Sequence, residues 1–166
     1  MSREIVYDGR RIRVAVASLL RIDGRTATKE IVLHPGAVAI LPVVDDEHVC
    51  LLRNFRFPLG QTLWEIPAGT LEPGEDVLHA AQRELAEETG YQAADWEMLT
   101  AFYPSPGIMD EVLHVFVGSS LTPGPMRLGI DEQMEPQTVA LAWVHDGTIR
   151  DAKTMIALLL WQSKRL

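Results

Sequence analysis

Hydrophobic and polar residues along this chain follow strand patterns in some segments and helix patterns in others. Between two Asp-Gly dipeptides, Ile12, Val14 and Val16 recur at every second position, a pattern typical of strands joined by tight hairpin turns. Segment 37–44 is apolar at nearly every position, which indicates a strand that is covered on both faces. An N-terminal antiparallel sheet over 1–34, followed by a buried strand, is therefore expected.

The rest of the chain extends this pattern to a mixed α/β fold. Further strands are expected over 49–53, 96–103, 112–117 and 139–144. Segment 151–163 is apolar on nearly all sides, as in a helix that is buried deeply or lies at an interface. Segment 104–111 is too rich in proline and glycine for a strand. Segment 121–136 shows no period and is expected to be an irregular segment, either a lid or a surface loop.

A second helix is expected immediately before Gly90, which stands where a C-terminal cap belongs. Glu75 and Asp76 lie in its expected first turn, where acidic side chains interact favourably with the helix dipole. At about 100° per residue, Glu84 and Glu88 fall inside the apolar arc of this helix. A helix that needed glutamates only for solubility would carry them on the opposite face.

Three glutamates of this helix are close neighbours. Glu84, Glu87 and Glu88 are spaced i, i+3 and i+4, so their carboxylates lie together on the helix surface and repel one another. Carboxylates that face protein are costly unless they are paired or bind a metal ion. Three hard oxygen donors on one turn suit Mg²⁺ or Mn²⁺, which also coordinate substrate phosphates. The competing interpretation is a solvated acidic face, with Arg83 pairing one glutamate.

Together with the preceding residues, this helix resembles the Nudix box. Every fixed position of that motif is present at the required spacing, in Gly69, Glu75, Arg83, Glu84, Glu87, Glu88 and Gly90. The resemblance implies a hydrolase that splits a nucleoside diphosphate linked to another group and that uses a divalent metal, Mg²⁺ or Mn²⁺. It also implies an α/β/α sandwich with a mixed sheet, here preceded by the N-terminal antiparallel sheet.

The same resemblance implies a role for each residue of the motif. Glu84 and Glu88 correspond to the principal metal ligands, and the carbonyl of Ala68 corresponds to a further ligand. Glu87 corresponds to an additional ligand or to a catalytic base. The remaining positions orient the loop and the helix: Gly69, Glu75, Arg83 and Gly90.

The proline-rich loop that follows resembles a mark of the ADP-ribose pyrophosphatases within this family. It contains Ser105, Pro106 and Gly107, and Glu111 matches the loop glutamate that serves those enzymes as the catalytic base. An exposed loop acid is the alternative for Glu111. Gly107 is expected in the substrate-binding loop, where glycine permits a turn with positive φ or a close approach to the ligand.

Two arginines follow an expected strand in an otherwise acidic chain. The rigid guanidinium fork of Arg53 and Arg56 suits the oxygens of a diphosphate, and a surface salt bridge is the alternative for each. By resemblance to the same family, Arg56 matches a substrate-binding arginine, which ranks it above Arg53. Both are therefore candidates for substrate binding.

Composition limits the partners of the protein. The 166 residues carry a net charge of −8, which argues against a nucleic-acid surface and makes binding of an anionic substrate depend on metal and on placed arginines. No apolar run approaches the roughly 18 residues of a membrane helix. None of the five histidines shows ligand spacing, and none is assigned to catalysis. The single cysteine, Cys50, lies in an apolar run, and a cytoplasmic protein is expected.

These observations predict an N-terminal β-sheet extension over 1–34, which forms a homodimer, and a Nudix hydrolase domain over 35–166. The expected reaction is the metal-dependent hydrolysis of ADP-ribose to AMP and ribose 5-phosphate. Within the same chemistry, the substrate is alternatively another nucleotide sugar, NADH or a dinucleoside polyphosphate. A non-catalytic ADP-ribose sensor is a further alternative, which the complete set of motif glutamates disfavours.

Overall fold

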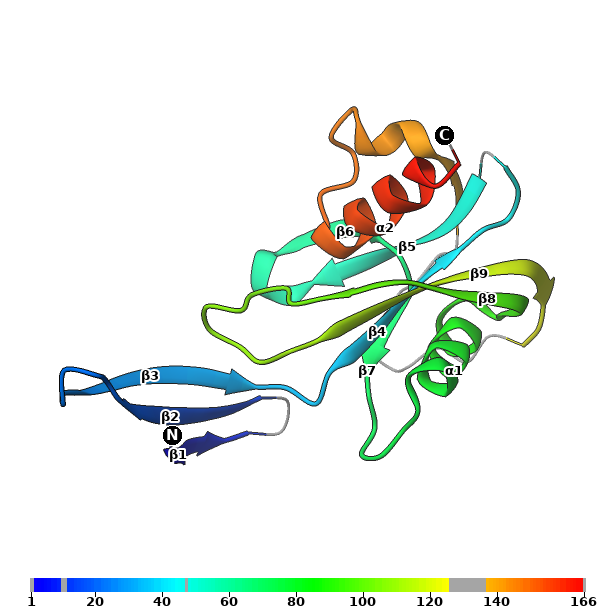
Figure 1. Cartoon of the computed structure of the whole chain (residues 1–166). Coiled ribbons are helices and arrows are strands. Elements are labelled where there is room, and N and C mark those ends of the chain that lie inside the picture. The colour runs from blue at the N-terminus through cyan, green and yellow to red at the C-terminus, as the bar shows by residue number, and fades with distance from the viewer. Residues whose placement is uncertain (1, 10–11, 47, 126–136, 166) are drawn as a thin grey trace.

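The computed structural model describes residues 2–9, 12–46, 48–125 and 137–165. Within these ranges the chain forms three β-sheets and two α-helices (Figure 1). None of the helices in this part of the chain has both the length and the apolar character that a membrane span requires.

The N-terminal sheet consists of β1 (Ser2–Asp8), β2 (Arg13–Leu20) and β3 (Thr26–Leu33), paired antiparallel in that order. The predicted hairpins are confirmed, and Gly24 takes a positive φ of 78° in the second turn. Figure 1 shows this sheet extending away from the helices, and β1 is exposed along its full length. The backbone of Val32 on β3 donates to Ile108 and accepts from Asp110, in the loop that also contains Glu111.

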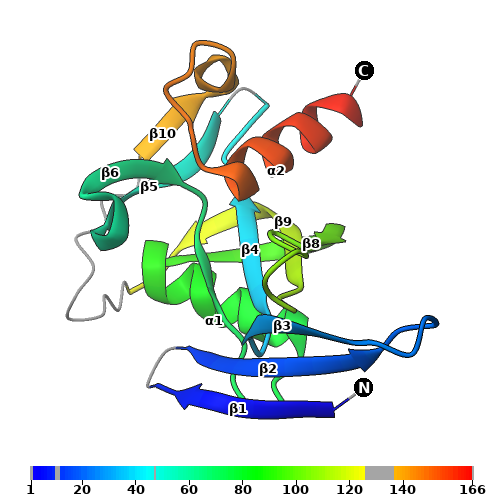
Figure 2. The ribbon, with the colours of Figure 1, turned by 90° about the vertical axis from the view of Figure 1, so that its left-hand side faces the viewer.

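The central sheet contains β7 (Ala68–Thr70), β4 (Ala37–Pro42), β9 (Leu113–Pro123) and β8 (Tyr91–Phe102), in that order. Strands β4 and β9 are parallel, whereas the other pairs are antiparallel, so the sheet is mixed. Figure 2 shows one helix on each side of this sheet.

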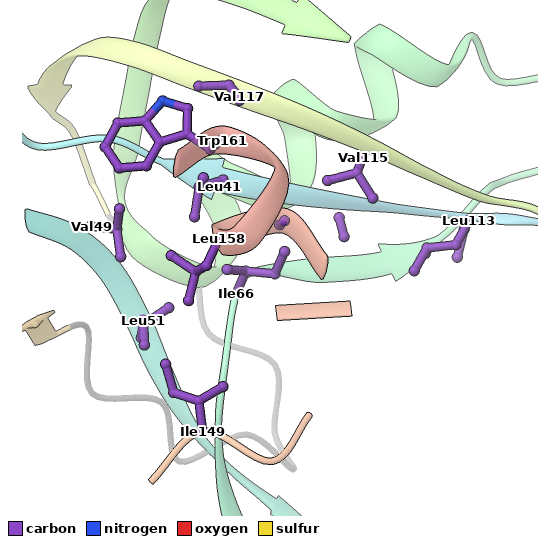
Figure 3. Packing of buried hydrophobic residues seen from close by; sticks show 13 residues of the cluster. Leu41, Val49, Leu51, Ile66, Leu113, Val115, Val117, Ile149, Leu158 and Trp161 are labelled. Atoms are coloured by element: carbon purple, nitrogen blue, oxygen red, sulfur yellow. The ribbon is translucent and has the colours of Figure 1, made fainter. Parts of the chain in front are cut away.

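Strand β4 is buried at every position because a helix covers each of its faces. Val38 and Ile40 pack in one apolar cluster with α1 (Val77–Thr89). Leu41 points to the opposite face, into the cluster that contains α2 (Ala152–Ser163; Figure 3). The predicted α/β/α sandwich with a mixed sheet is confirmed.

A third sheet lies beside α2 and contains β10 (Gln137–Ala140), β5 (His48–Arg56) and β6 (Gln61–Glu65), in that order. All its pairs are antiparallel. Two short 3₁₀ helices accompany it, η1 (Phe57–Leu59) and η2 (Leu141–Val144). This sheet carries Arg56 and Glu65 at the ends of its strands.

Several predicted strand boundaries are wrong. The strand expected over 49–53 runs to Arg56, so Arg53 and Arg56 lie on β5 and not after it, and the strand expected over 112–117 runs to Pro123. The strand expected over 139–144 ends at Ala140, and η2 follows it. Ala140 pairs with His48, the first residue of β5, so residues after Ala140 have no partner on that strand. The strand expected from residue 96 already begins at Tyr91, directly after the glycine that caps α1.

Segment 121–136 is described only in part. The sequence analysis expected an irregular segment here, and for residues 121–123 this is wrong. They form the end of β9, because Leu121 and Pro123 still pair with residues of β8. The prediction of a lid falls mainly on residues 126–136, which lie outside the described residues.

Candidate active site

Helix α1 ends at Gly90, as the sequence predicts, but it begins at Val77, so Glu75 and Asp76 lie before its first turn and that part of the prediction is wrong. Asp76 is its N-cap rather than a first-turn residue, and its carboxylate accepts hydrogen bonds from the N–H groups of Leu78 (3.0 Å) and His79 (3.1 Å). Gly90 ends the helix with a φ of 72° and donates its N–H to the carbonyl of Ala86. These caps determine which residues of the helix face the sheet.

The glutamates of α1 lie in two different environments. The side chain of Glu84 is 11% exposed, whereas that of Glu87 is 43% exposed. Glu88 is buried as well, and its Oε2 accepts a hydrogen bond from the N–H of Ala68 at 2.9 Å. The prediction that Glu84 and Glu88 face the protein interior is confirmed. Glu87 instead lines a separate cavity beyond Arg83.

Arg83 joins the helix to the loop that precedes it. It donates from Nε and Nη2 to the two oxygens of Glu75, at 2.9 and 3.0 Å, and from Nη1 to Glu84 at 2.7 Å. The hydrogen bonds from Arg83, together with one from the N–H of Glu72, lower the pKa of Glu75 to about 2. This arrangement supports an orienting role for Glu75 and Arg83.

Gly69 leaves room for a carboxylate. A Cβ atom at this position of β7 would overlap the carboxylate of Glu84. Its backbone pairs with Val38 of β4, so the strand cannot withdraw from the helix without losing that pairing. Glycine at this position therefore allows the Glu84 carboxylate to lie directly against β7.

Two cavities meet at these residues. The first, of about 730 Å³, is lined by Glu84 and Glu88 of α1 and by Gly9 and Arg13 of the N-terminal sheet. The second, of about 420 Å³, is lined by Glu111 and by residues of β8 and α2. Both cavities share the residues His34, Arg56, Ala68, Gly69 and Thr70. The structure thus brings Arg56, Glu111 and three of the predicted metal ligands, Ala68, Glu84 and Glu88, to two adjoining cavities, here called the hollow, whereas Glu87 lies outside it.

Of the two candidate arginines, only Arg56 lines these two cavities. Arg56 lines both cavities and is held by the buried carboxylate of Glu65, which raises its pKa. Arg53 lies over the ring of Trp64, with its guanidinium carbon 5.7 Å from the ring centroid. Trp64 itself packs against Trp143, with ring centroids 5.1 Å apart. Arg53 is therefore placed by stacking on β6, apart from the residues that line the two cavities.

The proline-rich loop contributes Glu111 but not Gly107 to the hollow. Glu111 is little exposed, and its Oε1 lies 3.5 Å from Nδ1 of His34. Gly107 lines a different cavity, beside the N-terminal sheet. The expected turn with positive φ is wrong, because the φ of Gly107 is not positive, and the close approach to a ligand stays a prediction. Its role in substrate binding stays a prediction.

Several residues of the hollow escaped the sequence analysis. His34 lines both cavities, and its Nδ1 accepts a hydrogen bond from the N–H of Gly36. Tyr103 and Lys153 line the second cavity. None of these residues belongs to a spaced motif. The only available signal was the occurrence of charged residues at the start of an otherwise apolar C-terminal helix.

The donor set at the first cavity fits a hard divalent cation. Two buried carboxylates and the backbone of Ala68 supply oxygen donors, which Mg²⁺ and Mn²⁺ prefer. In the described part of the chain, no three His, Cys, Asp or Glu side chains already converge as a metal-binding group. Glu84 is turned towards Arg83, and Glu88 towards the N–H of Ala68. Metal binding would therefore require small rotations of these carboxylates.

The sandwich, the capped helix with buried carboxylates and the adjoining cavities are features of one protein class. Residues 33–158 match the NUDIX domain, and the chain belongs to the NUDIX family. It is an enzyme of the class that acts on pyrophosphate bonds.

Individual relatives are similar over nearly the full chain. The ADP-ribose pyrophosphatase of Bacillus subtilis (strain 168) is 41% identical over 170 residues, which cover 99% of this chain and 92% of that protein. The methanol dehydrogenase activator of Bacillus methanolicus is 37% identical over 161 residues, which cover 93% of this chain and 87% of that protein. A crystal structure of an ADP compounds hydrolase superposes with a TM-score of 0.85 and 26% identity, over 98% of this chain and 91% of that one.

Proposed function

We propose that this protein hydrolyses the diphosphate of ADP-ribose to AMP and ribose 5-phosphate, with Mg²⁺ or Mn²⁺ as cofactor. The observation that carries the proposal is the pair of buried carboxylates, Glu84 and Glu88, at a hollow that also contains Arg56 and Glu111. The similarity to an ADP-ribose pyrophosphatase over nearly the full chain supports the choice of substrate.

The metal ligands in this proposal are Glu84, Glu88 and the carbonyl of Ala68. A bound divalent cation would neutralise part of the diphosphate charge and polarise the phosphorus that is attacked. This positive charge is needed because the chain carries a net charge of −8. Glu87 is the less favoured ligand or base, because it is exposed and lines the cavity beyond Arg83.

Glu111 is the proposed base that accepts the proton of the attacking water. Its carboxylate is held in the second cavity, on the loop that β3 binds through Val32. Arg56 would bind the diphosphate oxygens, because Nη1 and one N–H of Nη2 remain for the ligand after its two bonds to Glu65. Arg53 is a weaker candidate, since it stacks on Trp64.

We also propose that two copies of the chain associate through the N-terminal sheet. This sheet and its second turn expose several large apolar side chains, which is unusual for a surface that stays in water: Ile5, Val6, Tyr7, Leu19 and Leu20 on the strands and Ile22 in the turn. The same sheet lines the first cavity through Gly9 and Arg13. A partner on this sheet would therefore lie close to the substrate.

The experiment that tests the proposed reaction is a hydrolysis screen with Mg²⁺, with Mn²⁺ and with a chelator. Substrates are ADP-ribose, other nucleotide sugars, NADH and a dinucleoside polyphosphate, compared by kcat/KM. We expect ADP-ribose to have the highest value and the chelator to abolish turnover. A higher kcat/KM for another diphosphate would replace the substrate, and ADP-ribose binding without any turnover would indicate a sensor.

A further inference from the structure

A buried carboxylate binds two cations at the wall of the second cavity. Glu65, at the end of β6, is 2% exposed. Its Oε1 accepts a hydrogen bond from Nε of Arg56 at 2.7 Å, and its Oε2 accepts from Nη2 of Arg56 and from Nζ of Lys153. Because one oxygen binds both cations, the guanidinium and the ammonium lie on neighbouring sides of the same atom.

Lys153 is held from a second side by the cap of α2. Its Nζ also bonds to Oδ2 of Asp151 at 3.0 Å, and its side chain is only 12% exposed. Asp151 is itself fixed, since it accepts from the backbone N–H and the hydroxyl of Thr154. Thr154 in turn accepts from the N–H of Ile66, which follows β6. A side chain that is normally flexible is thus held in one place before substrate binds.

Among the described residues, one N–H donor of Lys153 has no protein partner. An ammonium group has three N–H donors, and the two carboxylates account for two of them. Lys153 lines the second cavity together with Arg56 and Glu111. Glu65 itself does not line that cavity, so a ligand there would meet the two cations and not the carboxylate that holds them. Two cations held side by side match the adjacent anionic oxygens of a diphosphate.

We propose that Lys153 is a further substrate-binding residue, which donates to a diphosphate oxygen beside Arg56, and that Glu65 is the positioning residue for both cations. This inference rests on the proposed function only for the identity of the substrate. Lys153 binds through a point charge, whereas Arg56 binds through its planar fork. Asp151, the N-cap of α2, also binds the ammonium group and so holds it at the N-terminus of that helix.

Steady-state kinetics test the role of Lys153. Lys153→Met removes the charge but keeps most of the side-chain volume. In this variant Glu65 keeps its bonds to Arg56, and Asp151 keeps its bonds to Thr154. We expect KM for ADP-ribose to rise about tenfold, kcat to stay within about threefold, and Lys153→Arg to retain most of the affinity. The control is Lys164→Met, a surface lysine that pairs with Glu97. A KM for Lys153→Met within about twofold of the wild type would overturn the assignment.

Chemical labelling tests contact without turnover. The chain contains three lysines, Lys29, Lys153 and Lys164, so an amine-reactive reagent followed by mass spectrometry resolves each one. In the Glu111→Gln variant with Mg²⁺, which should bind the substrate with little turnover, ADP-ribose and, separately, inorganic pyrophosphate should slow labelling of Lys153 by at least about threefold, with Lys164 unchanged. Equal labelling with and without both probes would refute the contact. If pyrophosphate protects but the wild-type enzyme does not hydrolyse ADP-ribose with metal, the inference stands and the proposed substrate fails.

Glu65→Asp tests the positioning role. The shorter side chain keeps the buried negative charge but withdraws it from the two cations. KM for ADP-ribose should rise at least as much as in Lys153→Met, with a smaller change in kcat, because both binding groups lose their anchor. An unchanged KM in a folded Glu65→Asp variant would show that Glu65 only balances charge.

Discussion

Glu84 and Glu88 lie one helical turn apart, and the fold shields both from water. Each carboxylate is bonded in the described structure, Glu84 to Arg83 and Glu88 to the N–H of Ala68. Those partners offset part of the cost of burying two like charges on one helix. In the proposed function, a divalent cation would offset more of that cost.

The metal assignment predicts a large kinetic effect for Glu88→Gln. We expect kcat to fall by roughly a hundredfold or more, because a charge that holds the cation is lost. The amide oxygen still accepts from Ala68, so the thermal midpoint should change little. Steady-state kinetics and thermal unfolding check both, with the exposed Glu97→Gln as the control. Turnover within about threefold of the wild type would show that Glu88 is not a metal ligand.

Gly69→Ala should act through Glu84. The added methyl group would overlap the Glu84 carboxylate, which must rotate away because the backbone of β7 is held by β4. We expect weaker Mn²⁺ binding by calorimetry and at least a tenfold loss of kcat, with the fold retained. Gly74→Ala is a poor control because Gly74 has a positive φ. Gly118→Ala serves instead, because it adds the same methyl group to β9 of the same sheet, where the nearest side chains are Ala93, Ile40 and Leu85. Wild-type Mn²⁺ affinity in Gly69→Ala would argue against Glu84 as a ligand.

Glu111→Gln tests the proposed base. The amide keeps the size and hydrogen bonding of the side chain but cannot accept the proton, so kcat should fall by about a hundredfold or more. KM should change less than threefold, because Glu111 does not hold the phosphates. Steady-state kinetics against pH measure both parameters. If Glu87→Gln lowers kcat far more than Glu111→Gln, the base is on the helix and not on the loop.

At the scale of elements, the ion pair between Glu75 and Arg83 connects the loop after β7 to α1. Arg83 also contacts the carbonyl of Thr70 at 3.5 Å. The pair therefore holds the loop, the strand and the helix in register while contributing no group to the two adjoining cavities.

This pair predicts a pH-dependent contribution to stability. The pKa of Glu75 is about 2 in the folded protein, against a usual value of 4.5. Its contribution is therefore complete above about pH 4.5 and is lost as the pH falls towards 2. Thermal unfolding should show that Glu75→Gln lowers the midpoint by a constant amount between pH 6 and 8 and by progressively less below pH 4.5. A difference that does not depend on pH would mean that the charge of Glu75 is not involved.

At the scale of the whole molecule, the N-terminal sheet is the surface on which the proposed dimer depends. It projects from the sandwich (Figure 1), and its edge strand β1 is exposed throughout. An exposed apolar edge strand invites pairing with another chain. The hollow borders on this sheet through Gly9 and Arg13, so association would enclose the substrate further.

The dimer proposal predicts a change of mass in solution. Analytical ultracentrifugation should give twice the monomer mass for the wild type and a monomer for Val6→Glu combined with Leu20→Glu. Both side chains are exposed in the single chain, so the charges should not disturb its folding. Met98→Glu, an exposed apolar position on β8, is the control and should remain dimeric. A monomeric wild type would refute the proposal.

The sequence by itself determined the features that depend on local spacing. The period of α1 placed Glu84 and Glu88 towards the core, and Gly90 marked its C-terminal end. The continuous apolar run of β4 predicted a strand with two covered faces, and the spacing of the Nudix box identified the family. Each of these signals acts between residues that are close in the chain, where backbone geometry alone relates one side chain to the next.

Only the tertiary structure decided which distant residues meet at the site. Glu65 and Lys153 are far apart in the chain, and no spacing rule connects them, yet they share a bond at the cavity wall. The two arginines three residues apart have separate environments, because Arg56 reaches Glu65 while Arg53 lies over Trp64. The end of β10 was likewise decided by the length of its partner strand. Such contacts arise from the packing of whole elements, and that packing leaves no local period in the sequence.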